Sequence, residues 1–172
     1  NLTKDNIYVL ESPILSNSQY AKFLDFFKDD FKVLDCTFNV QNNLKKRLDQ
    51  LCSEAELAVR EGYKHLILSD KQLSEKKAIV PMILAFGAIN SKLINLGIRG
   101  FVSINVQTGE VLDTHSFAVL LGVGATTINP YLAFDSIYQR YEKKLFGNYS
   151  YDKCVQQYIK SVDNGLLKIM SK

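Results

Sequence analysis

The sequence is poor in the residues that most often carry metal or covalent chemistry. Among its 172 residues there are 2 histidines, 3 cysteines, 3 prolines and no tryptophan. A zinc site needs three or four convergent ligands, and no HxxxH, HxxE or CxxC spacing supplies them. The odd number of cysteines, all in apolar surroundings, favours reduced, buried thiols in a cytoplasmic protein over a disulfide framework.

Charge of one sign and long apolar runs are also absent. The net charge is only +3, and lysines and arginines are interleaved with acids, so no basic stripe points to nucleic acid. No apolar run approaches the roughly 20 residues of a membrane-spanning helix, and no signal peptide opens the chain. We therefore expect no nucleic-acid or membrane partner. Because the chain starts at Asn1 instead of Met, we expect it to be a piece excised from a longer protein.

What the sequence does contain is a repeated strand-then-helix pattern. Hydrophobic residues make up 47% of the chain and charged residues 23%, as in an ordinary soluble domain, and we predict a single domain over residues 1–172. The predicted strands begin near residues 32, 65, 100 and 126, and these spacings leave room for the crossover helices that parallel strands need. An eight-stranded barrel needs about 250 residues. The fold class is therefore predicted as α/β, with about four mostly parallel strands and crossover helices, resembling a degenerate or half (β/α) barrel. The predicted strands are 32–38, 65–69, 100–106 and 126–128, and the predicted helices are 17–27, 44–61, 81–96, 116–121, 130–144 and 151–170.

Glycine, proline and asparagine mark the predicted element boundaries. Gly62 and Gly97 are expected to end helices. Proline is favoured in the first helical turn, which indicates helix starts at Pro81 and Pro130, and Asn129 is predicted to cap the second of these. Gly122 and Gly124 precede a strand, whereas a dinucleotide-binding loop follows one, so we interpret these two as tight-turn residues.

The candidate functional residues are few. Asp70 follows the second strand, at the sheet edge where α/β folds place ligands, although a structural turn is the preferred interpretation. His115 precedes a helix at a connection that could open to a ligand, whereas His65 begins a buried strand and is expected to serve in packing. Cys36 lies in no nucleophile elbow. We predict no catalytic, cofactor-binding or metal-binding residue. Two alternatives stay open: a small-ligand-binding domain or enzyme using Asp70, His115 and Asn129, and a protein-interaction module docking through helix 131–146.

Four segments in a fixed order carry a family resemblance. Residues 11–17 (ESPILSN), 67–70 (ILSD), 122–134 (GVGATTINPYLAF) and 164–172 (NGLLKIMSK) together closely resemble the large subunit of glutamate synthase, in the later part of its central domain. The resemblance covers residues 10–172. Val123 replaces a frequent aromatic, Ser116 replaces a second histidine, and helix 81–96 lacks the histidines associated with that segment.

The resemblance implies a structural part in a larger enzyme. Glutamate synthases convert glutamine and 2-oxoglutarate to two glutamates, with a reduced nicotinamide or ferredoxin as electron donor. An amidotransferase domain with an N-terminal cysteine nucleophile releases ammonia, and a tunnel leads it to a domain that binds FMN and a 3Fe-4S cluster. The central domain is a degenerate barrel-like form between these two modules and helps wall the tunnel. The implied partners are thus the amidotransferase and FMN-binding domains of the same polypeptide, and no cofactor is implied for this chain itself.

Overall fold

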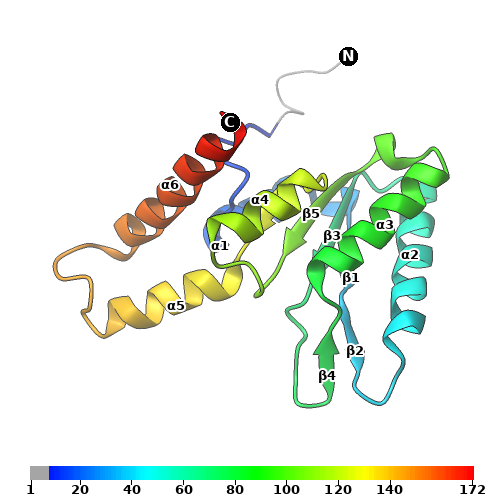
Figure 1. The fold of residues 1–172 in the computed structure, drawn as a ribbon, viewed down its shortest axis with the longest axis horizontal. Helices are drawn as coiled ribbons and strands as arrows, with labels where there is room; N and C mark the ends of the chain where they lie inside the picture. Colours follow the sequence, from blue (N-terminus) through cyan, green and yellow to red (C-terminus); the bar gives the residue numbers. More distant parts are fainter. Residues whose placement is uncertain (1–7) are drawn as a thin grey trace.

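A four-stranded parallel sheet organises the molecule (Figure 1). The computed structural model describes residues 8–172. The sheet order is β1-β3-β5-β6, and each strand pairs in parallel with the next. The four strands of this sheet lie side by side in the same order as they occur along the chain. The sheet therefore winds in one direction, as in half of a (β/α) barrel. The predicted fold class is confirmed. The strands are β1 (Phe31–Asp35), β3 (His65–Ser69), β5 (Ser103–Gln107) and β6 (Thr127–Asn129).

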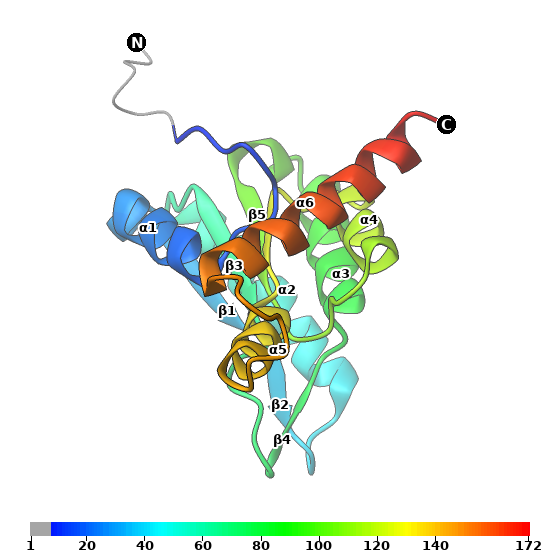
Figure 2. The same cartoon turned by 90° about the vertical axis from the view of Figure 1, so that its left-hand side faces the viewer.

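The connecting helices cover one face of the sheet and the first helix covers the other. Alternate residues of a strand point to opposite faces. Leu66 and Leu68 accordingly join the core built with α2, α3 and α4, whereas Ile67 joins a second core with Tyr20 and Phe23 of α1. The last helix packs on α4 and α5 (Figure 2). The helices are α1 (Asn17–Phe27), α2 (Leu44–Arg60), α3 (Met82–Asn95), α4 (Thr114–Gly122), α5 (Tyr131–Glu142) and α6 (Tyr151–Met170).

The predicted strand 32–38 is in fact two strands with different partners. After β1 ends at Asp35, the chain forms β2 (Thr37–Asn39), which pairs antiparallel with β4 (Lys77–Ile79) as a separate two-stranded ribbon. The Asp35 carboxylate accepts hydrogen bonds from the backbone N–H and the hydroxyl of Thr37, at 3.0 and 2.7 Å, and so fixes the turn between the strands. A continuous β-rich run does not reveal such a change of partner.

Two predicted helix starts are one residue too early. Asn129 is the last residue of β6 and does not cap α5, which begins at Tyr131 with Pro130 as its N-cap. Pro81 is likewise the N-cap of α3. It has no side-chain group to offer, and a carboxylate oxygen of Glu110 instead accepts from the Met82 N–H at 2.6 Å.

Other boundaries differ where a short 3-10 turn or a cap intervenes. The third strand begins later than predicted, since residues 99–101 form a 3-10 turn, and α4 begins at Thr114 because the Asp113 side chain caps it. The bounds of α1 and α6 are as predicted. Of the four glycines expected to end helices or turn the chain, three have positive φ, namely Gly62 (96°), Gly97 (69°) and Gly124 (108°), whereas Gly122 is the last residue of α4.

Candidate functional site

The carboxyl edge of the sheet carries a buried acidic group. Asp70 follows β3 and is only 1% exposed. Its carboxylate accepts a hydrogen bond of 2.5 Å from the Thr108 hydroxyl and two of 3.1 Å from the Gly109 N–H. These donors follow the neighbouring strand β5, so Asp70 ties two strand ends together. Because the carboxylate is buried and held by these donors, its role is structural, but its hydrogen bonds cross to the neighbouring strand end and do not close the local turn that we predicted.

Tyr131 lies beside this carboxylate, and Lys71 lies beside Tyr131. A Cβ added at Gly109 would lie 3.1 Å from the Tyr131 hydroxyl, which shows how tightly the strand-end loop and the start of α5 pack. Burial raises the pKa of the Tyr131 hydroxyl well above its ordinary value, and the negative charge of Asp70 raises it further. The Lys71 ammonium lies 5.8 Å from the centroid of the Tyr131 ring. Burial and the charge of Asp70 both favour the protonated form of this tyrosine.

The face of the sheet toward α1 carries a row of polar side chains that the sequence reasoning missed. The Ser69 hydroxyl donates to Gln107 Oε1 at 2.8 Å, and Gln107 Nε2 donates to Asn129 Oδ1 at 3.3 Å. Asn129 Nδ2 in turn donates to the backbone oxygen of Leu15 and to Asn17 Oδ1. The alternation of polar and apolar residues in β5 and β6 is the sequence pattern from which this row could have been predicted. It joins three strands to the start of α1.

A second polar row crosses the same face nearer the amino ends of the strands. The Thr127 hydroxyl donates to Asn105 Oδ1 at 2.8 Å, and Asn105 Nδ2 donates to Ser103 Oγ at 3.1 Å. Ser103 Oγ is 2.6 Å from His65 Nδ1. Burial lowers the pKa of His65, whose ring packs on Phe27 with centroids 3.9 Å apart. His65 is therefore a packed, hydrogen-bonded residue, as predicted.

The three residues of the ligand-binding alternative are not joined in one site. Asn129 is held in the first polar row and Asp70 in its strand-end turn, whereas His115 is exposed on the first turn of α4. His115 lines a hollow of about 200 Å³ between α3 and α4, together with Glu110. Within residues 8–172 no hydrogen bond links His115 to Asp70 or to Asn129. The geometry offers no catalytic arrangement built from these three.

Comparison with known proteins decides the family. The model of the glutamate synthase central domain matches residues 2–172. The chain belongs to the glutamate synthase central domain family. It is 43% identical over 173 residues to the large chain of the NADPH glutamate synthase of Azospirillum brasilense, covering 99% of this chain. It is 37% identical to the corresponding chain of Bacillus subtilis and 36% identical to the chloroplastic ferredoxin-dependent glutamate synthase of Oryza sativa subsp. japonica, each covering 95% of this chain.

This central domain chain spans a small part of those relatives. It covers 11% of the length of each of the three proteins. The match to the family model confirms, at the level of the family and of the domain, the resemblance drawn from the four sequence segments. The chain thus corresponds to one domain of these longer relatives.

The cysteines of this central domain do not form a ligand set for an iron–sulfur cluster. Cys36 lies between β1 and β2, Cys52 lies on α2 and Cys154 lies on α6, and all three are free. Burial raises the pKa of the Cys36 thiol to about 12. In the part of the chain that the structure describes, no group of three or more His, Cys, Asp or Glu residues could hold a metal ion. Iron–sulfur clusters need converging thiolates, and these residues do not fit one.

None of the helices within residues 8–172 is both long and apolar enough to cross a membrane.

Proposed function

We propose that this chain is a noncatalytic structural domain of glutamate synthase, placed between the amidotransferase and FMN-binding domains of one polypeptide. One observation carries the proposal: the polar side chains at the strand ends, and those on the face of the sheet toward α1, form hydrogen bonds with one another. Asp70 is held by Thr108 and Gly109, and Ser69, Gln107 and Asn129 form a continuous row. Polar groups that are hydrogen-bonded within the protein in this way stabilise the fold and are not free to bind a substrate.

In the proposed assembly the domain also helps wall a path for ammonia. The loops that follow the four strands are the part we assign to this role, because parallel α/β folds bring such loops together at one edge. Lys71 is exposed in one of them, directly after the buried Asp70. FMN, the 3Fe-4S cluster and the nicotinamide or ferredoxin donor belong to other domains in this proposal. We place the protein in the cytoplasm, where its three free cysteines stay reduced.

A binding experiment tests the noncatalytic assignment. The 172-residue chain is expected to bind neither FMN nor 2-oxoglutarate and to release no ammonia from glutamine. A specific ligand would raise the melting temperature by mass action, so a thermal-shift titration with each compound measures binding directly. Flavin retained stoichiometrically through purification, or glutaminase activity, would overturn the assignment and favour the ligand-binding alternative.

A coupling experiment tests the ammonia path in the full-length protein. Lys71→Trp places a large side chain in a strand-end loop, and Lys64→Trp places the same group at the opposite end of β3, where the lysine is also exposed. We expect Lys71→Trp to raise the ammonia released to solution per glutamate formed, and Lys64→Trp to leave this ratio unchanged. Equal ratios in both variants and the wild type would contradict a role of these loops in the path.

A further inference from the structure

The last turns of α6 expose apolar side chains that the described part of the chain, residues 8–172, does not cover. Leu167 is 63% exposed, Ile169 50% and Met170 82%. Earlier on the same helix, Val155 and Val162 are buried against the body of the molecule. The apolar side chains of α6 are thus covered along most of the helix and become exposed only at its carboxyl end. Concentrated exposure of this kind is typical of a contact surface.

These side chains line one wall of an apolar groove. The groove has a volume of about 590 Å³ and lies between α6, α4 and the segment that precedes α1. The Ser12 hydroxyl donates to Asp163 Oδ1 at 2.8 Å and so fastens this segment to α6. We call this feature the α4–α6 groove. Its lining includes Glu11, Pro13, Ala118, Leu121, Leu167 and Met170.

The chemistry of the groove suits an apolar peptide better than a small metabolite. Small-molecule pockets combine apolar walls with several convergent polar groups. The α4–α6 groove has two acidic side chains among its lining residues, Glu11 and Asp163, and Asp163 already accepts a hydrogen bond from Ser12. An occupant with apolar side chains, and a basic group near exposed Glu11, would match this surface.

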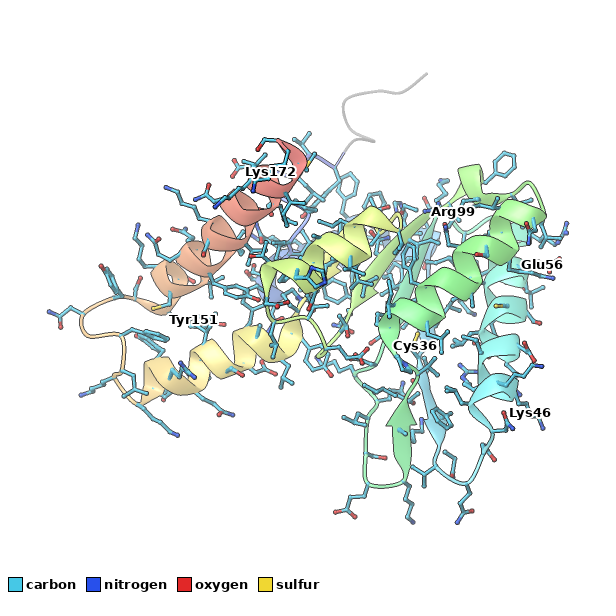
Figure 3. All side chains as sticks on the ribbon, viewed as in Figure 1. Cys36, Lys46, Glu56, Arg99, Tyr151 and Lys172 are labelled. Carbon is cyan, nitrogen blue, oxygen red and sulfur yellow. The ribbon has the colours of Figure 1, made fainter. Side chains whose placement is uncertain are left out.

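The position of the groove points to one such occupant. Met170 lines the groove and is the last residue of α6. Lys172, two residues later, lies at the end of this helix opposite Tyr151 (Figure 3). The relatives are far longer than this chain, which covers 11% of their length, and the proposed function places a further domain on each side of it. An extended chain reaches about 3.3–3.6 Å per residue, so a few residues beyond Lys172 suffice to reach the groove. A short tether also holds its segment at an effective concentration of about 1 mM, which favours this segment over free partners.

We propose that, in the full-length protein, the polypeptide directly following Lys172 folds back and fills the α4–α6 groove with apolar side chains. This rests on the proposed function, because it takes the chain to be one domain of a longer polypeptide. Filling the groove would hold the next domain in a fixed orientation relative to the half barrel. It would also cover Leu167, Ile169 and Met170, which residues 8–172 leave exposed.

Photo-crosslinking in the full-length protein tests this proposal. A benzophenone amino acid replaces Leu167 in one variant and Lys168 in the other, and mass spectrometry identifies the crosslinked peptides. Lys168 is the control, since it is exposed in the same turn but does not line the groove. We expect the Leu167 variant to crosslink to the polypeptide shortly after Lys172, with a yield that does not fall on dilution. We expect the Lys168 variant to give no such crosslink.

The other outcomes separate this proposal from the proposed function. A crosslink from position 167 to a second copy, to a segment that precedes this chain, or to no peptide at all would overturn the assigned occupant. Glutamine-dependent synthesis of glutamate from 2-oxoglutarate is measured on the wild-type protein from the same expression. Its absence would count against the proposed function, whereas activity together with crosslinks elsewhere would refute only the occupant of the groove.

Discussion

Helix α6 packs on α4 at a glycine, and this contact gives a sharp stability prediction. A Cβ added at Gly165 would lie 2.6 Å from Thr114 Cγ2 and 2.8 Å from Thr114 Oγ1, distances that real Cβ atoms essentially never show. Gly87, in the middle of α3, is a matched control because a Cβ there meets nothing within 4 Å. The same substitution to alanine should therefore have opposite effects at the two positions.

The magnitudes follow from two competing terms. Replacing glycine by alanine inside a helix stabilises by about 1 kcal/mol. Forcing an extra methyl group into a packed contact costs about 1–3 kcal/mol. At Gly87 only the first term acts, so Gly87→Ala should gain about 1 kcal/mol. At Gly165 the backbone of α6 meets a β-branched side chain that cannot retreat along a flexible stem, and the two terms together predict a net loss of up to about 2 kcal/mol.

Thermal denaturation followed by circular dichroism measures both effects. For a domain of this size, 1 kcal/mol shifts the melting temperature by about 2–4 °C. Thr114→Ala removes both of the closest atoms, so combining it with Gly165→Ala should recover most of the loss, as a coupling in a double-mutant cycle. If Gly165→Ala raises the melting temperature as Gly87→Ala does, α4 and α6 do not pack as closely as described here.

Three further predictions concern backbone strain, pH and the buried carboxylate. Gly124→Val should destabilise by about 1–3 kcal/mol, because a β-branched residue would be forced to the φ of 108° found at this turn; unchanged melting would contradict the turn. Burial lowers the pKa of His65 below its ordinary 6.5, so the unfolded chain takes up the proton first as the pH falls. Stability should hold above pH 6.5 and decline below it, and His65→Gln, unlike the control His115→Gln, should flatten this decline in urea denaturation. Asp70→Ala should cost at least about 1–3 kcal/mol in the same assay, because it removes the acceptor of the buried Thr108 hydroxyl and the Gly109 N–H, and a neutral result would refute the structural role of this carboxylate.

Much of the backbone could be predicted because it depends on neighbours in the chain. The periodicity of apolar residues placed α1 and α6 at their observed bounds, and glycine placed the turns at residues 62, 97 and 124. The order of strands and helices, with enough residues between strands for crossovers, led to the parallel sheet. The candidate site could be predicted only in part. The position of Asp70 after a strand indicated a place at the sheet edge, but nothing in the sequence indicated its hydrogen-bond partners Thr108 and Gly109.

By itself, the sequence determined the family, the fold class and much of the local conformation, since these follow from residue type, spacing and the order of short motifs. Tertiary structure alone decided which residues meet. It paired β2 with β4 after the end of β1. It also joined Ser69 to Gln107, 38 positions away, in the polar row on the face of the sheet toward α1. It also pressed Gly165 against Thr114 and left the α4–α6 groove open. Such contacts depend on how whole elements pack, and spacing along the chain carries no record of that packing.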